Sequence, residues 1–317
     1  MHVVITGGAG YIGTRLARRV LTHPAFAEAT VTIVDTASGN CGDDPRVRMV
    51  AGDLREASVR REALRSRPDI VFHLAGILGG AAEDNYDLAR GVNIDATLSL
   101  LEELRDAAKP PRVVFTSSIA VFGPLHCGAV DDDTRASPHM VYGAQKHMIE
   151  TAIENFSARG SIDGLALRMP GIVARRDADR RMKAAFLNHV FYAFEAGRDY
   201  TLPVSSDGTS WLLSVPGCVE ALIHGALLPR ERLGARRAFT LPAQRVKMEQ
   251  IVHALARQFR GSPSNIQYAP DLELERQFAR QPRLITELAD ALGFRHDGTV
   301  EALVRRAMDP EIPGALG

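Results

Sequence analysis

The sequence has few cysteines and few aromatic residues. Its cysteines are Cys41, Cys127 and Cys218, and Trp211 is the single tryptophan among 317 residues. Cysteines that are odd in number and far apart do not suggest a disulfide framework, and they lack the spacing of metal ligands. We therefore expect each to be structural or incidental, as suits a reducing compartment, and we expect no metal site.

The chain also lacks a net charge and a long hydrophobic run. Lysine plus arginine and aspartate plus glutamate each number 38, so the formal net charge is zero. No basic excess favours a nucleic acid or an anionic membrane as partner. The most apolar stretch, 70–82, is too short to span a bilayer. A strand pattern begins at residue 2 without a cationic leader, so we expect no signal peptide and a cytoplasmic location.

A glycine-rich loop joins the first predicted strand, 2–6, to a helix predicted over 14–22. Gly7, Gly10 and Gly13 fit the spacing G-x-x-G-x-x-G. The first allows a tight turn, the second lets a phosphate approach, and the third lets the helix pack closely. The helix start would then hold a pyrophosphate. A flexible glycine turn is the alternative, which the position at the first strand-to-helix junction disfavours.

Two acids follow the next predicted strands. Asp35 ends the strand 31–35, about 20 residues after the last glycine, the separation expected of a ribose-binding carboxylate. An acid there repels a 2′-phosphate, so it predicts NAD rather than NADP, and a solvated acid is the alternative. Asp53 follows the strand 47–51. It can cap the helix predicted over 55–66 or touch the adenine, and the two roles are compatible.

The fourth and fifth predicted strands, 70–74 and 112–118, end in small and hydroxyl residues. We interpret His73, inside the apolar fourth strand, as a core histidine. Ser117 and Ser118 end the fifth strand. The carboxyl ends of strands in an open α/β sheet border the crevice where ligands bind. A serine at this position is therefore a candidate for contact with a substrate.

Tyr142 and Lys146 lie four residues apart in a helix predicted over 141–157. This spacing places both side chains on one face. A phenol has a pKa near ~10, and a neighbouring ammonium group favours its phenolate form. Such a pair can take a proton from an alcohol. Most pairs at this spacing are ordinary solvated neighbours, so the pair gains weight only beside the glycine loop and the serines.

Arginines gather after the sixth predicted strand, 165–168. One of Arg175, Arg176 and Arg180 can hold a substrate carboxylate by a bidentate contact, although a solvated helix entry explains any one of them. We interpret Trp211 as a core residue, with a wall of the substrate pocket as the alternative.

Strand and helix patterns alternate from residue 2 to about residue 168. This alternation predicts a doubly wound parallel α/β sheet with helices on both faces. From about residue 182 the alternation loosens. We therefore expect a dinucleotide-binding domain at 1–170. Residues 171–317 are expected to form mainly a smaller α+β substrate lobe, which can return strands to the sheet.

Several motifs occur together in a recognisable order. They are TGGAGYIG at 6–13, GDL at 52–54, HLAG at 73–76, TSSIAVFG at 116–123 and YGAQK at 142–146. With them the chain resembles the extended short-chain dehydrogenase/reductase superfamily, which has a Rossmann fold and includes the NAD-dependent epimerase/dehydratase group. The resemblance covers nearly the whole chain.

The resemblance implies roles for individual residues. Tyr142 would accept the proton, Lys146 would bind the nicotinamide ribose and lower the tyrosine pKa, and Ser118 would hold the substrate oxygen. The implied cofactor surface comprises Gly7, Gly10, Tyr11, Ile12, Gly13, Asp35, Asp53, Leu54, Leu74, Ala75, Gly76, Asn93, Thr116, Tyr142, Lys146, Pro170 and Ile172. The expected substrate contacts are Ser118, Ile119, Tyr142, Arg175, Arg176, Arg180 and Trp211.

The resemblance also bears on assembly and activity. A long helical pattern runs over 86–108, and helices near 93–108 and 142–157 often form a homodimer interface in this superfamily. The segments FTSSIAVFGPL, VDDDT and WLLSVPGCVEALIHGA resemble dehydrogenases that oxidise the 2-hydroxyl of a four-carbon sugar acid. A nucleotide-sugar 4-epimerase or dehydratase that retains NAD is the alternative. A non-catalytic sensor of NAD(P) is the remote one.

Overall fold

A large parallel sheet forms the centre of the molecule. The computed structural model describes residues 1–37, 44–105, 109–125, 128–176 and 183–309. The sheet consists of β1 (His2–Thr6), β2 (Thr30–Asp35), β3 (Val47–Ala51), β4 (Ile70–His73), β5 (Arg112–Ser118), β7 (Asp163–Met169) and β11 (Ala238–Thr240). Its order is β11-β7-β5-β4-β1-β2-β3, and all neighbours are parallel. This order confirms the predicted doubly wound α/β sheet.

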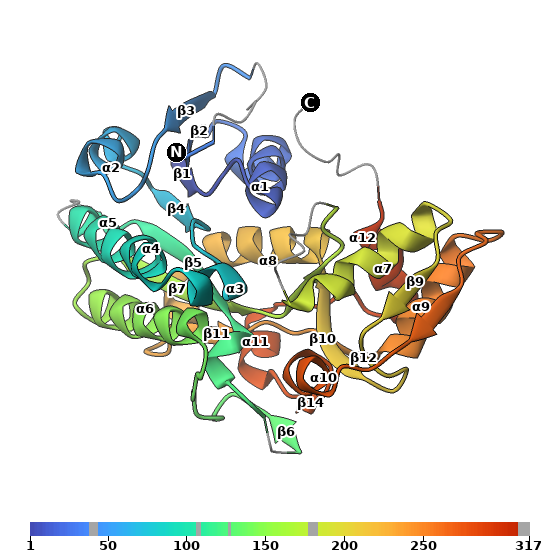
Figure 1. The fold of residues 1–317 in the computed structure, drawn as a ribbon. Coiled ribbons are helices and arrows are strands. Elements are labelled where there is room, and N and C mark those ends of the chain that lie inside the picture. The colour runs from blue at the N-terminus through green and yellow to red at the C-terminus, as the bar shows by residue number, and fades with distance from the viewer. Residues whose placement is uncertain (38–43, 106–108, 126–127, 177–182, 310–317) are drawn as a thin grey trace.

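Helices cover both faces of the sheet (Figure 1). On one face lie α1 (Tyr11–Thr22) and α8 (Val215–Leu227). On the other lie α2 (Ala57–Leu64), α5 (Thr97–Leu104) and α6 (Val141–Ala158). Successive strand residues supply the two cores alternately, because their side chains point to opposite faces.

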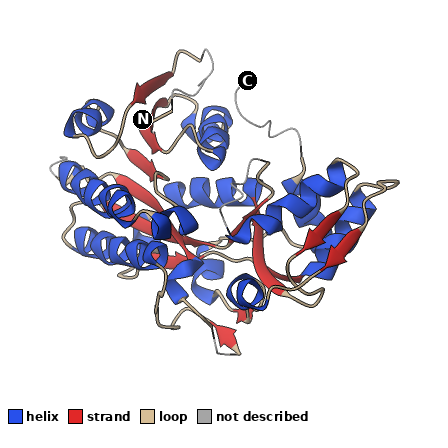
Figure 2. Ribbon diagram, in the orientation of Figure 1, coloured by secondary structure: helices blue, strands red, loops and turns tan. Residues whose placement is uncertain are grey.

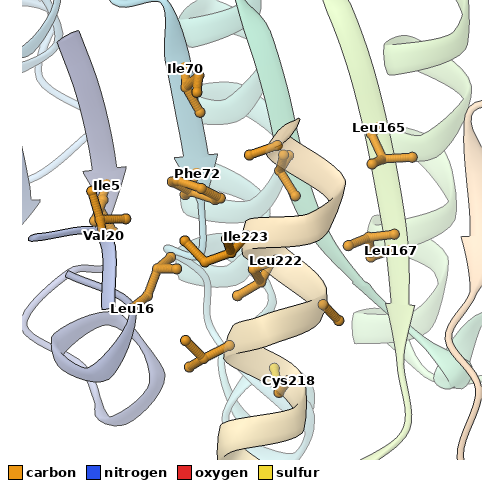
Figure 3. Close-up of a cluster of buried hydrophobic side chains, with 14 of the residues drawn as sticks. Ile5, Leu16, Val20, Ile70, Phe72, Leu165, Leu167, Cys218, Leu222 and Ile223 are labelled. Carbon is orange, nitrogen blue, oxygen red and sulfur yellow. The ribbon is translucent and has the colours of Figure 1, made fainter. Parts of the chain in front are cut away.

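The core beneath α1 and α8 shows this alternation. Ile5 packs there against Leu16 of α1 and Leu222 of α8 (Figure 3), whereas Val4 belongs to the opposite core. Both strand residues are fully buried. The strand patterns of the sequence are therefore continuous apolar runs, as expected for a sheet covered on both sides.

The rest of the chain forms a smaller lobe of helices and short strands (Figure 2). A three-stranded sheet pairs β10 (Thr209–Ser214) in parallel with β8 (Gly171–Val173) and antiparallel with β12 (Gln244–Lys247). The other elements of this part are α7 (Phe186–Glu195), β9 (Tyr200–Leu202), α9 (Met248–Gln258), β13 (Ile266–Tyr268), α10 (Leu272–Phe278), β14 (Arg283–Leu284), α11 (Glu287–Leu292) and α12 (Val300–Ala307). β11 belongs to the large sheet, and α8 packs against one face of that sheet. Residues after 171 therefore contribute to the large sheet and its helices as well as to the smaller lobe.

Three predicted helices differ from those observed, and the helix predicted over 14–22 begins three residues earlier, at Tyr11. The helical pattern over 86–108 is divided into α4 (Tyr86–Arg90), a π-helical turn (Gly91–Ala96) and α5. The short helix α3 (Gly79–Asp84) precedes α4. The helix predicted over 55–66 begins two residues later, with Glu56 at its N-cap. Among the described residues, no helix has the length and apolar character that a bilayer crossing requires.

Candidate active site

The glycine loop brings two backbone segments into close contact. Gly7 has φ +68°, and a Cβ atom there would lie 2.7 Å from the backbone nitrogen of Ala75. A Cβ at Gly13 would lie 2.6 Å from the Cα of Gly8 and closer still to the carbonyl oxygen of Gly7. Only glycine fits these contacts, which keep the end of β1 tight against the start of α1.

The start of α1 suits a dinucleotide pyrophosphate. Gly10 is its N-cap and offers no side-chain bond, and the first turn contains no acid. The helix therefore presents backbone N–H groups and a positive dipole end to an anion. Asp35 lies beside this loop, since its carboxylate accepts hydrogen bonds from Ala9 N (3.0 Å) and Ala37 N (3.1 Å). The residues present therefore fit NAD.

Asp53 does not cap α2, so that expected role is wrong. Its carboxylate accepts from the backbone of Arg55 at 2.8 Å and from the Arg55 guanidinium at 2.7 and 3.0 Å. These bonds hold the pKa of Asp53 below its usual value. Its contact with the adenine stays a prediction.

Asn93 lies in the π-helical turn and joins three elements. Its Oδ1 accepts from Ile77 N at 2.8 Å, and its Nδ2 donates to Ile77 O at 3.0 Å and to Gln145 Oε1 at 2.7 Å. The side chain thereby fixes the loop after β4 against α6. Its contact with the cofactor stays a prediction, and no local sequence pattern indicated the π turn.

His73 is a core histidine, as interpreted. Its ring nitrogens are bonded to Thr6 Oγ1 at 2.6 Å and Thr97 Oγ1 at 2.9 Å. Burial and, secondarily, the charge of Lys146 lower its pKa to about 3. The imidazole therefore stays neutral and links β1, β4 and α5.

The remaining predicted cofactor residues lie at the carboxyl end of the sheet. Thr116 of β5 donates its hydroxyl to His73 O at 3.1 Å. The others follow β3, β4 and β7, or lie in the first turn of α1 and in β8: Leu54, Leu74, Ala75, Gly76, Pro170, Ile12 and Ile172.

Ser118, Tyr142 and Lys146 come together where β5 ends and α6 begins. The Ser118 oxygen accepts from Ala120 N at 3.1 Å, and the Ser118 hydroxyl is hydrogen-bonded to Tyr142. The Lys146 nitrogen lies 5.5 Å from the centre of the Tyr142 ring and 4.4 Å from that of Phe115. A hydroxyl, a phenol and an amine on adjoining elements can bind an alcohol oxygen and move its proton.

Burial dominates the titration of this set. It raises the pKa of Tyr142 to about 12, against the positive charge of Arg175 and the hydrogen bond from Ser118. It also lowers the pKa of Lys146 to about 7, against the negative charge of Glu150. From the sequence we expected Lys146 to lower the pKa of Tyr142. In this structure, the positive charge that opposes the effect of burial on that pKa is the charge of Arg175. Without ligands, the phenol stays protonated at neutral pH.

The predicted arginines differ in their surroundings. Arg175 follows β8, is largely buried, and donates its backbone N–H to Asn188 Oδ1 at 2.7 Å. Arg176 points to the surface, where it pairs with Glu195 at 2.8 Å and lies 4.5 Å from the centre of the Tyr192 ring. Arg180, together with Cys41 and Cys127, lies outside the described residues. Of the two described arginines, Arg175 is the one that acts electrostatically on Tyr142.

Trp211 is almost fully buried, which contradicts its predicted contact with a substrate. It is 1% exposed, and its ring N–H donates to Pro282 O at 2.8 Å. It packs with Val121 and Phe122 of the turn after Ser118, and Ile119 packs against the same cluster. Trp211 therefore supports the segment that carries the serine.

Tyr11 joins the cofactor loop to the segment that carries Arg175. Its hydroxyl donates to Ala174 O at 2.8 Å, and the hydroxyl of Tyr192 donates to the same oxygen at 3.2 Å. The sequence predicted Tyr11 from its place in the loop but missed Tyr192 and Asn188, which lie on a helix with no motif. Within the described residues, no cluster of histidine, cysteine or acid residues could hold a metal ion.

Comparisons with known proteins define the class. The model of the NAD dependent epimerase/dehydratase family matches residues 3–223. The chain is 35% identical over 318 positions to a D-erythronate dehydrogenase from Cupriavidus necator, with 98% of each chain covered. A D-erythronate dehydrogenase from Haemophilus influenzae is 31% identical over 313 positions, covering 98% of this chain and 99% of the relative.

A solved structure agrees with this result. The nucleoside-diphosphate-sugar epimerase from Agrobacterium tumefaciens superposes with a TM-score of 0.89 at 29% identity, covering 100% of this chain and 96% of that one. The chain belongs to the NAD-dependent epimerase/dehydratase family, and it is an oxidoreductase-type enzyme that uses NAD. The non-catalytic sensor is therefore without support.

Gly13→Ala should weaken NADH binding about tenfold or more. The new methyl group would meet the backbone of Gly7 and Gly8, and overpacking of this kind typically costs ~1–3 kcal/mol. Fluorescence titration with NADH measures the dissociation constant. Gly128→Ala is the control, because a Cβ there meets nothing within 4 Å. Equal affinities of the two variants would contradict the role of Gly13.

Proposed function

We propose that this protein oxidises the 2-hydroxyl of a small sugar acid to a 2-oxo acid, with D-erythronate as the first candidate and 2-oxo-tetronate as its product. Two relatives that match over nearly the full length are named D-erythronate dehydrogenases. The site independently favours a small hydroxy acid.

The position of Arg175 carries this proposal. Its charge acts on Tyr142 directly, and Ser118 is hydrogen-bonded to the same phenol. In a 2-hydroxy acid the carboxylate is attached to the carbon that bears the reacting hydroxyl. An arginine beside the base therefore suits this substrate class, because guanidinium groups bind carboxylates through two parallel hydrogen bonds.

Each side chain then has one task. Tyr142 takes the proton of the 2-hydroxyl, and Ser118 holds that oxygen. Lys146 stabilises the phenolate by its charge and contacts the ribose of the cofactor, while Arg175 orients the carboxylate. NAD+, when bound to the glycine loop and Asp35, supplies the hydride acceptor. Substrate binding brings a new negative charge beside Arg175, and NAD+ brings a positive one near Lys146.

A nucleotide-sugar 4-epimerase or dehydratase is the second candidate. The family includes such enzymes, and the similar Agrobacterium tumefaciens structure is titled an epimerase. That activity would use the same Ser118, Tyr142 and Lys146. It predicts NAD that stays with the purified protein and no release of NADH.

We further propose a homodimer formed through α5 and α6. These helices contact each other, and they lie side by side on the outer face of the sheet (Figure 1). On α6, Met148 is 51% exposed, so a large apolar side chain is available on the surface of this helix. A cytoplasmic location is proposed from the few, widely separated cysteines.

Tyr142→Phe should lower kcat by about 10²- to 10⁴-fold, the usual contribution of general base catalysis. NADH affinity should change little, because the ring remains. Steady-state NADH formation and NADH titration measure the two quantities. Tyr86→Phe, at a tyrosine that is 55% exposed, is the control. Turnover near that of the unmodified enzyme would exclude Tyr142 as the base.

Arg175→Met should raise KM for the sugar acid by about 10- to 100-fold, since hydrogen bonds to charged groups contribute ~1.5–3 kcal/mol. Arg176→Met is a matched control, because the neighbouring guanidinium pairs with Glu195 at the surface. The thermal midpoint of each variant shows whether it is folded. A larger rise in KM for the Arg176 variant would contradict the assignment.

A further inference from the structure

Glu150 is a buried acid on the helix that carries Tyr142 and Lys146, and the proposed mechanism gives it no role. It lies on α6, one turn beyond Lys146 and two turns beyond Tyr142, and it is 2% exposed. A buried carboxylate is costly unless it is paired and hydrogen-bonded. Its partners therefore indicate what it stabilises.

Those partners come from three elements. Ser117 Oγ of β5 donates to Glu150 Oε1 at 2.5 Å. Arg168 of β7 donates to both carboxylate oxygens, at 2.9 and 2.8 Å. His147 Nδ1 of α6 lies 3.3 Å from Oε2. Because Ser117 directly precedes Ser118, the carboxylate ties the strand that carries the serine to the helix that carries Tyr142 and Lys146.

Arg168 extends this connection to the turn after Ser118. Its guanidinium lies 5.2 Å from the centre of the Phe122 ring, within range of a cation–π contact. Phe122 is 2% exposed in the cluster that includes Trp211. Glu150 and Arg168 thus contact residues that precede and follow Ser118 in the chain.

The charges that face Lys146 can be traced element by element. α6 contributes the Glu150 carboxylate and the protonated phenol of Tyr142, and β4 contributes His73, which stays neutral because its pKa is about 3. β5 contributes the uncharged ring of Phe115. Glu150 is the group that raises the lysine pKa against burial. Beyond it lie two further basic groups, Arg168 and His147, which contact the Glu150 carboxylate.

We propose that Glu150 is a positioning residue that favours the ammonium form of Lys146 and fixes Ser118 relative to Tyr142. The catalytic part of this inference rests on the proposed roles of Lys146 and Tyr142. The electrostatic part concerns the protein without substrate and stands independently of the reaction.

The sign of the effect follows from the pairings. Glu150→Gln removes the negative charge near Lys146 and leaves the Arg168 cation uncompensated. Both changes disfavour the ammonium form, so Lys146 loses its proton at lower pH. Arg168→Gln removes the competing cation and leaves more of the negative charge of the carboxylate uncompensated, so Lys146 keeps its proton to higher pH. The two variants therefore shift the titration in opposite directions.

The test is a direct titration of Lys146 by NMR of protein labelled with ¹³C at the lysine ε-carbon. The chain contains just four lysines, Lys109, Lys146, Lys183 and Lys247, so Lys146→Arg assigns the signal. We expect the midpoint to fall by about one pH unit in Glu150→Gln and to rise in Arg168→Gln. Glu154→Gln removes an exposed acid from the same helix and should leave it unchanged. His147→Gln should move it less than Glu150→Gln.

The same variants test the catalytic part. As Lys146 loses charge, the phenolate of Tyr142 is stabilised less, so the acidic limb of kcat/KM in Glu150→Gln, along which the rate rises as Tyr142 loses its proton, should move to higher pH. Ser117→Ala keeps the carboxylate and should lower kcat without moving the Lys146 midpoint. If folded Glu150→Gln and Arg168→Gln both leave the midpoint in place, the inference is overturned. A shifted midpoint with an unshifted rate profile would overturn the catalytic role alone. Absence of turnover in the unmodified enzyme would count against the proposed function and not against the titration.

Discussion

The proposed chemistry of this protein depends on burying Tyr142 and Lys146 against the carboxyl end of β5. Burial moves the two pKa values in opposite directions, to about 12 for the phenol and about 7 for the amine. Both shifts favour the uncharged forms. An exposed pair would titrate near its ordinary values and would respond weakly to a ligand, because water screens exposed charges. The buried pair responds strongly to any charge brought next to it.

Three charged side chains surround this pair from different parts of the chain. Arg175 acts on the tyrosine, and Glu150 acts on the lysine while being paired with Arg168. A sugar acid would neutralise the first influence, and a nicotinamide would add a positive charge. The ligands and the fixed charges thus act on the same two titrating groups. This arrangement links substrate choice to proton transfer through the position of Arg175.

Much of the fold was predictable because local sequence signals and tertiary packing agree. Gly7 and Gly13 are required by backbone contacts that any residue with a Cβ would break, so their spacing carried the prediction. Tyr142 and Lys146 were predictable from helical periodicity. The sequence could not show which of Arg175 and Arg176 faces Tyr142, because this depends on the direction that the chain takes after β8. Trp211 was correctly interpreted as a core residue, whereas its predicted contact with a substrate was wrong.

The burial of Glu150 and the π turn at Asn93 could not be predicted from the sequence. The four-residue spacing that places Tyr142 beside Lys146 also places Lys146 beside Glu150. The buried carboxylate of Glu150, however, is hydrogen-bonded to Ser117 and Arg168, which precede and follow α6 in the chain. Likewise, the π turn at Asn93 is fixed by Ile77 and Gln145. Contacts between residues far apart in sequence leave no local pattern.

The most direct test of the proposed activity is NADH formation by the purified protein with NAD+ and a panel of four- to six-carbon sugar acids. We expect NADH release with at least one 2-hydroxy acid, with the highest kcat/KM for D-erythronate. A different preferred acid would keep the mechanism and change the substrate. No NADH with any acid, together with NAD that remains bound through purification, would contradict the dehydrogenase and favour the nucleotide-sugar enzyme.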